Sequence, residues 1–249
     1  MNIKRNTILA LCFLSIIFLF SACSDETEPA GNIDFGYEYF PLAVGKYRVY
    51  VSDSIVLRSA GTIRDTLKSY IREEIIEQNI SAEGDTMYYV NVYFKRKVDD
   101  DWKYQKTVFV TKSVQKVTRQ EDNLLFTKMV FPLKAGLRFN HNQYFDSQID
   151  IVIGGEVMRA MYDGWNTRVE TINKDLLFEG NKVKNVKIRL VDDVSTSLEK
   201  KVYYETYIQN IGLYSKTMIF LQDNNTGTEP IEERAVKGFY HNLTLLEHN

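Results

Sequence analysis

Three histidines, His141, His241 and His248, are the side chains best suited to metal binding or acid–base chemistry. Zinc sites use ligands at characteristic short spacings, often with cysteines among them, and these histidines do not form such a set. Two of them lie near the C-terminal end, and no cysteine follows Cys23. The sequence therefore predicts surface histidines, with no metal site and no other cofactor.

Adjacent carboxylates occur at Glu73-Glu74, Asp192-Asp193 and Glu232-Glu233. A glycosidase needs two such groups facing each other across a cleft, whereas neighbouring residues on a strand point to opposite faces of the sheet. These pairs are therefore predicted to be solvated. The chain also contains neither a Gly-x-Ser-x-Gly elbow nor a phosphate-binding glycine loop. We expect no catalytic residue and a protein that is not an enzyme.

Two further groups of residues could bind ligands. The run from Asp99 to Asp101 lacks the spacing of a calcium loop, and is predicted to be a charged hairpin tip. Trp102, Trp165 and many tyrosines could stack on a sugar, although aromatic side chains in strands usually pack in the core or in cross-strand pairs. Glycan binding therefore stays an alternative.

Three short segments carry Asp, then Ser or Thr, then an apolar residue: 53–55, 65–67 and 85–87. This pattern resembles the O-glycosylation acceptor of exported Bacteroidetes proteins. The resemblance implies possible modification at Ser54, Thr66 and Thr86.

The N-terminal segment has the layout of a signal peptide. Lys4 and Arg5 precede an apolar run over residues 7–20, which is shorter than the ~20 residues of a transmembrane helix. The small residues Ser21-Ala22 then precede Cys23, and this ending resembles the lipobox of bacterial lipoproteins. The resemblance implies a leader over 1–22 and lipid, including palmitate, attached to Cys23. Ordinary secretion with Cys23 as a free thiol is the alternative.

Residues 23–36 are acidic and contain Pro and Gly, so we expect a flexible tether. Loss of Cys12 with the leader and acylation of Cys23 would leave no disulfide. The acidic residues after Cys23 resemble a surface-export signal of Bacteroidetes lipoproteins. Ser24, in place of Asp at the second position, resembles the outer-membrane sorting signal of other Gram-negative bacteria. We expect a lipid anchor in the outer membrane, on its periplasmic or cell-surface face, with the membrane as partner through Cys23.

Composition predicts a β-rich domain over residues 37–249. The chain has 16 Tyr and 14 Phe but 4 Pro, and its 31 basic and 33 acidic residues nearly balance. This balance argues against a nucleic-acid partner. Alternating or apolar strand-like runs recur from residue 47 onward, with few helix signals. The predicted fold class is mainly antiparallel β, as a curved sheet, a sandwich or an open barrel.

Individual segments differ in clarity. Residues 47–51 and 182–191 alternate as half-buried strands do, whereas residues 70–79 fit helical spacing as well as an extended strand. Polar loops are expected at 83–85 and 223–227.

The sequence Phe-Pro-Leu-x-x-Gly occurs twice, at residues 40–45 and 131–136. A proline with fixed φ and a permissive glycine at this spacing predict the same bend before a strand. Two copies favour two similar halves of one domain that meet near residue 130, with coincidence as the alternative.

These two motifs, with Tyr203 to Tyr207 leading into Asn210 to Tyr214, resemble a group of uncharacterised Bacteroidetes lipoproteins. The group usually has a further glycine near residue 210 and a tryptophan near 138, which this chain lacks. The resemblance implies β structure at the cell envelope and carries no activity. We expect a non-catalytic interaction or structural module, or alternatively a protein that binds a glycan or small apolar ligand on the concave face of its sheet.

Overall fold

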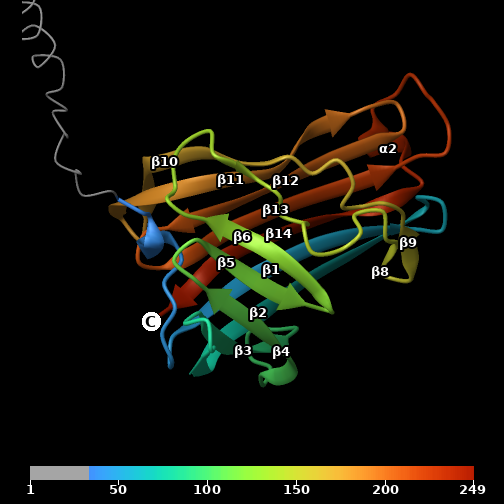
Figure 1. Cartoon of the computed structure of the whole chain (residues 1–249). Coiled ribbons are helices and arrows are strands. Elements are labelled where there is room, and N and C mark those ends of the chain that lie inside the picture. Colours follow the sequence, from blue (N-terminus) through green and yellow to red (C-terminus); the bar gives the residue numbers. More distant parts are fainter. Residues whose placement is uncertain (1–33) are drawn as a thin grey trace, which may run out of the picture. The chain divides into compact units, whose positions relative to one another are not determined.

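Strand-forming residues occupy most of the chain from Tyr47 onward, in a computed structural model that describes residues 34–249 (Figure 1). The first half contains the short 3₁₀ turn η1 (Tyr37–Tyr39) and the strands β1 (Tyr47–Arg58), β2 (Ile63–Ile80), β3 (Thr86–Lys95), β4 (Lys103–Lys112), β5 (Lys116–Glu121) and β6 (Leu124–Val130). The second half contains β7 (Arg138–Phe139), β8 (Ile151–Ile153), β9 (Glu156–Met158), β10 (Thr167–Phe178), β11 (Asn181–Ser195), β12 (Glu199–Ile208), β13 (Gly212–Gln222), the helix α2 (Ile231–Arg234) and β14 (Lys237–His248).

Twelve of these strands form one antiparallel sheet in the order β6-β5-β4-β3-β2-β1-β14-β13-β12-β11-β10-β7. Strands β8 and β9 form a separate hairpin. Strands that follow one another in this sheet are neighbours, except that β6 and β7 form its two edges. Strands β1 and β14, which are far apart in sequence, pair in its middle. The predicted antiparallel β class is confirmed.

The connection between β6 and β7 requires the sheet to curl. A flat sheet of twelve strands would place its edges about 50 Å apart at ~4.8 Å per strand. Residues 131–137 join the two edge strands and can span at most about 27 Å. The edges in fact approach closely, because the N–H of Thr127 in β6 donates a 2.9 Å hydrogen bond to the carbonyl of His141, just beyond β7. The sheet is therefore a nearly closed, barrel-like curve.

Both copies of the Phe-Pro-Leu-x-x-Gly motif make the same hydrogen-bonded turn. The N–H of Gly45 donates to the carbonyl of Ile75, and the N–H of Ile75 donates back to Lys46. In the same way, Gly136 donates to Val169, which donates back to the residue after the glycine. Both glycines have positive φ, 87° and 81°, a region that other residues rarely occupy. Each turn thus attaches the start of one strand to its neighbour in the sheet.

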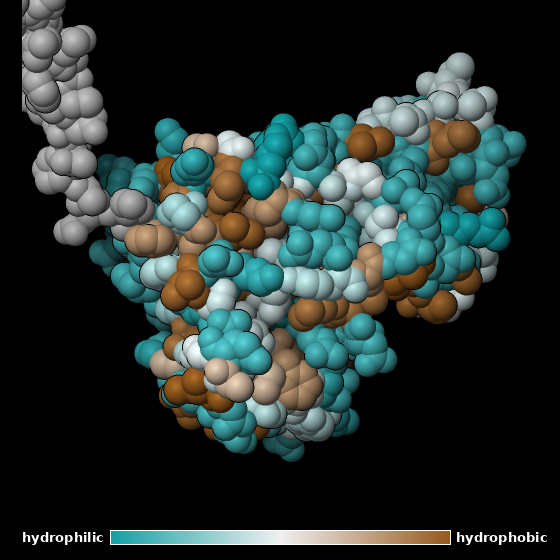
Figure 2. Space-filling view, in the orientation of Figure 1, coloured by the Kyte–Doolittle hydropathy of each residue, from teal (hydrophilic) through white to brown (hydrophobic). Residues whose placement is uncertain are grey.

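Apolar packing differs on the two faces of the sheet. On the concave side, a large cluster includes Val90, Val108, Val186, Ile188 and Phe220. On the other side, α2 covers a small patch made by Leu57, Leu221, Ile231 and Ala235. On the face shown in Figure 2, brown apolar residues lie in separate small groups among teal polar ones. Burial is thus concentrated inside the curl.

The segment with ambiguous spacing, residues 70–79, lies within β2, where a register shift falls between Ile75 and Glu77. The predicted loops at 83–85, 99–101 and 223–227 all lie between strands or before α2. Residues 35–249 form one compact unit. The leader 1–22, Cys23 and the tether up to residue 33 lie outside the described residues.

Candidate functional site

The concave side of the curled sheet encloses a cavity of about 780 Å³. Its lining follows strand alternation: residues 48, 50, 52, 54 and 56 of β1 face the cavity, as do residues 67, 69, 71, 73 and 75 of β2. Asp122 and Val152 also line it, although Val152 is 67% exposed and the Asp122 side chain is 76% exposed. The mouth therefore lies between the β5–β6 turn and the β8–β9 hairpin. The volume is within the usual range for small-molecule sites.

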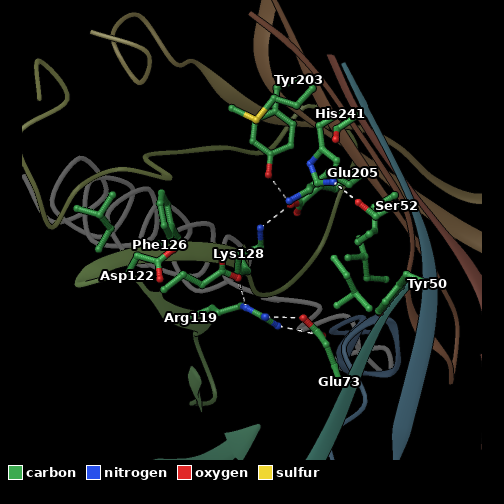
Figure 3. A pocket seen from close by; sticks show the side chains of 18 of the residues that line it. Tyr50, Ser52, Glu73, Arg119, Asp122, Phe126, Lys128, Tyr203, Glu205 and His241 are labelled. Atoms are coloured by element: carbon green, nitrogen blue, oxygen red, sulfur yellow. Dashed lines mark hydrogen bonds and ion pairs between the residues drawn. The ribbon is translucent and has the colours of Figure 1, made fainter. Parts of the chain in front are cut away.

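Glu205 of β12 is the centre of one polar network on the cavity wall (Figure 3). Its Oε1 accepts hydrogen bonds from Lys128 Nζ (2.5 Å) and from the hydroxyl of Tyr203 (2.9 Å). Its Oε2 accepts one from the hydroxyl of Tyr207 (2.5 Å). Burial alone would raise the pKa of Glu205, but the charge of Lys128 and these hydrogen bonds lower it to about 2. The carboxylate is thus ionised, and both of its oxygens accept hydrogen bonds.

Arg119 of β5 forms a second network across the cavity (Figure 3). It donates two hydrogen bonds to Glu73, from Nη1 at 3.1 Å and from Nη2 at 2.5 Å, and a third from Nε to Glu121. Burial acts to raise the pKa of Glu121, yet the charges of Arg119 and Lys216 outweigh it and lower the pKa to about 2. Both carboxylates therefore balance the buried guanidinium.

Ser52 and His241 form a third polar pair, with 3.0 Å between Ser52 Oγ and His241 Nε2. Burial, together with the charge of Lys216, lowers the pKa of His241 to about 3. The imidazole is neutral at neutral pH and can donate one hydrogen bond while accepting another. Figure 3 shows both side chains on the cavity wall.

The rest of the lining is largely apolar. An aromatic cluster packs across the gap between β6 and the loops that follow β7; its rings are Phe126, His141, Phe145, Tyr162, Trp165 and Tyr203. Aliphatic side chains from β1 to β4 and from β13 and β14 complete the wall, among them Val56, Ile71, Ile75, Val90, Val110, Met218 and Leu243. The cavity can therefore hold an apolar body beside polar groups.

The prediction of surface histidines is wrong for two of the three. His141 is 2% exposed and packs at a tilt between the rings of Phe126 and Trp165, where burial lowers its pKa to about 3. His241 lines the cavity. His248 is half-buried beside Phe178. The curl of the sheet creates an interior that strand alternation alone does not predict, and the imidazole rings of His141 and His241 lie in this interior.

Of the paired acids, Glu73 and Glu74 do point to opposite faces of β2, but Glu73 is not solvated, and Glu232 and Glu233 lie on the helix α2 rather than on a strand. Glu73 faces the cavity, where its side chain is 15% exposed, whereas Glu74 bonds to Arg72 outside it. Asp192, Asp193 and Glu232 form partly exposed ion pairs.

The remaining sequence-predicted residues are dispersed. Ser54 lines the cavity, Thr66 is exposed on β2 and Thr86 is half-buried at the start of β3, so glycosylation at these residues stays a prediction. Trp165 lines the cavity, whereas Trp102 lies under Lys95. Cys23 lies outside the described residues.

Sequence reasoning missed most of the cavity residues. Glu205, Lys128, Arg119 and Lys216 each occupy an inward position of an alternating strand, where a charge usually marks the solvent side. One available signal was the tyrosine pair that flanks Glu205 at i−2 and i+2 on the same face, because aromatic neighbours on one face indicate burial.

Within residues 34–249, no group of three His, Cys, Asp or Glu side chains could hold a metal ion. In the same range, no helix is both long and apolar enough to cross a membrane.

No family model and no curated protein matches the chain. Two solved structures are similar at low identity. One is a presumed exported protein with a YmcC-like fold from Bacteroides fragilis: TM-score 0.41, 9% identity, covering 84% of this chain and 98% of the other. The second is a presumed lipoprotein from Parabacteroides distasonis: TM-score 0.38, 10% identity, covering 85% and 98%. These likenesses are too low to support an argument about function.

Proposed function

We propose that this protein is a lipid-anchored, non-catalytic binding protein of the cell envelope, which holds a small ligand inside its curled sheet. The observation that carries the proposal is the cavity of about 780 Å³, lined by apolar walls and by a few convergent polar groups. A purely structural module has no need of such a volume, because an unfilled interior forgoes packing contacts. The cavity on the concave face therefore favours a ligand-binding function over a purely structural one.

The anchor is part of the same proposal. Lipid on Cys23 would tether the domain to the outer membrane, because each buried CH₂ contributes about 0.8 kcal/mol and two or three chains hold almost permanently. Globomycin blocks cleavage of lipoprotein signal peptides, so we expect the uncleaved precursor to accumulate in its presence. We expect the Cys23→Ala variant to be absent from the membrane fraction. The proposed anchor would be contradicted if globomycin did not inhibit cleavage and if the wild-type and variant chains were both found in the soluble fraction.

The binding proposal is tested with the neutral fluorescent probe N-phenyl-1-naphthylamine. The mature chain carrying Cys23→Ser, in buffer without detergent, is expected to bind it saturably. Ser54→Trp places a large ring in the cavity and should weaken binding, whereas the matched control Thr66→Trp adds the ring on the outer surface. Circular dichroism checks that both variants fold. Absence of saturable binding, or equal binding by all three proteins, would rule the proposal out.

The non-catalytic part rests on the Ser52–His241 pair. In a serine hydrolase a carboxylate bonds the second ring nitrogen and orients the imidazole. Within the described residues, no carboxylate is hydrogen-bonded to His241. Hydrolysis of p-nitrophenyl butyrate should therefore be the same for the wild type and Ser52→Ala. A loss of turnover in the variant would instead indicate an esterase.

A further inference from the structure

Lys216 lines the cavity from the middle of β13, where the carboxylates of Glu121 and Glu205 act on its charge only through space. Within residues 34–249, no hydrogen bond or ion pair reaches its ammonium group. The register places it directly opposite Glu205 on β12, the natural partner across a strand pair. Glu205, however, already accepts bonds from Lys128, Tyr203 and Tyr207. Lys216 is therefore left facing the cavity.

The other cations of the lining all have acceptors. Arg119 bonds to Glu73 and Glu121, and Lys128 bonds to Glu205. Arg48 donates to the backbone carbonyls of Ile211 and Pro41. A ligand that offers an acceptor would thus meet Lys216 without breaking an existing interaction.

Counting charges gives the same result. The lining has four cations, Arg48, Arg119, Lys128 and Lys216. Three carboxylates, Glu73, Glu121 and Glu205, face them, because the fourth, Asp122, binds Lys106 on both oxygens at the exposed mouth. Four against three leaves one positive charge, which a single anionic group would neutralise.

The surroundings of Lys216 offer both polar groups, next to which an anionic group could bind, and apolar surface. His241 lies on β14 as a diagonal neighbour on the same face, since it pairs with Met218, two residues from Lys216. The Ser52–His241 pair therefore adds neutral polar groups close to the cation. Met218, Phe239 and Leu243 provide adjacent apolar surface.

We propose, resting on the proposed binding function, that the cavity ligand is an amphiphile with one acidic group, whose anion pairs with Lys216 while its apolar body lies against the aromatic and aliphatic wall. Burial lowers the pKa of Lys216, and an anionic ligand would reverse part of that cost by supplying the missing charge.

The test compares two probes that share one aromatic body. 8-Anilino-1-naphthalenesulfonate carries a single negative charge, and N-phenyl-1-naphthylamine carries none. The wild-type mature chain with Cys23→Ser should bind the anion more tightly. Lys216→Met should weaken binding of the anion by about tenfold or more and leave the neutral probe unchanged. The matched control Lys68→Met, at an exposed position on β2, should change neither.

The outcomes separate the two proposals. If the wild type binds neither probe, the binding function fails. If it binds the neutral probe at least as tightly as the anion, or if Lys216→Met weakens both probes equally, the anionic specificity is overturned and the binding function stands. Circular dichroism reports folding, and Lys216→Gln replaces the Met variant if that variant is unfolded. If both variants are unfolded, the wild-type preference between the two probes still tests the anionic specificity.

Discussion

Glu205 shows how a single side chain links the cavity to stability. It is 1% exposed and balances Lys128, so its ionised form belongs to the folded state. Replacing it with Gln leaves a buried lysine without an anion. We expect Glu205→Gln to lose about 3 kcal/mol of unfolding free energy at neutral pH, measured by urea denaturation. Glu229→Gln, at an exposed loop position, is the control and should change little. A Glu205→Gln variant as stable as the control would contradict the network.

The same carboxylate predicts a pH dependence. The folded-state pKa of Glu205, about 2, lies below its ordinary value of 4.5. The unfolded chain therefore binds more protons in this range, and the stability that Glu205 supplies is present above pH 4.5 and is lost as pH falls toward 2. Glu205→Gln should show a shallower decline in unfolding free energy between these values. Parallel curves for the two proteins would indicate that another group dominates.

Lys216, in contrast to Glu205, should lower the free energy of unfolding at neutral pH. Burial holds its pKa below the ordinary value of 10.5, so the unfolded chain binds the proton more tightly and the folded state is penalised at neutral pH. We expect Lys216→Met to raise stability by about 1 kcal/mol, seen as a higher melting temperature. The advantage should shrink as pH rises toward 10.5. A destabilised Lys216→Met would mean that the ammonium has a stabilising partner.

At the scale of elements, alternation and composition were sufficient to predict strands. Residues 47–51 and 182–191 lie in β1 and β11, and the expected loops separate strands. Alternation could not say which face is interior, because Arg48, Tyr50 and Ser52 line the cavity although they are more polar than their neighbours. The helical spacing of residues 70–79 was misleading because β2 contains a register shift after Ile75. Tertiary pairing, rather than local preference, decided both cases.

Two glycines test the packing of their elements. A Cβ on Gly238 of β14 would lie 2.1 Å from the carbonyl oxygen of Phe220 in the neighbouring strand, whereas one on Gly136 would meet nothing within 4 Å. Both have positive φ, so both alanine variants carry backbone strain. We expect Gly136→Ala to cost about 1 kcal/mol and Gly238→Ala to cost several times more, measured by thermal unfolding. Equal costs would show that β13 and β14 can separate locally.

For the whole molecule, the sequence predicted an antiparallel β fold, with a curved sheet, a sandwich and an open barrel as alternatives, but not the residues that line the site. The cavity arises from strands distant in sequence: Arg119 in β5 reaches Glu73 in β2, and Lys128 in β6 reaches Glu205 in β12. These contacts depend on the degree of curl, which the short β6–β7 connection imposes. No local sequence pattern encodes the degree of curl, so the sequence predicts these charged residues to be ordinary surface residues.

The arrangement of the two edges also predicts what happens if their connection is cut. Lys134, Ala135 and Gly136 are exposed, so a protease site inserted after Ala135 should be cleavable. The fragments before and after the cut should remain associated, because β1 and β14 pair along ten residues in the middle of the sheet. Gel filtration of the cleaved protein checks this. Two separately eluting fragments would show that the β6–β7 connection, rather than the β1–β14 pair, holds the halves together.

The central place of β14 has a consequence for biogenesis. This strand is the last of the described strands to emerge, whether from the ribosome or from an export channel, yet it lies between β1 and β13. Strands β1 to β6 can pair early, but one edge of β1 keeps a row of unpaired backbone amides and carbonyls until the final strand emerges. Such an edge is a template for pairing with other chains. Chaperone cover should therefore matter most for β1, and it should become dispensable once β14 has emerged and paired.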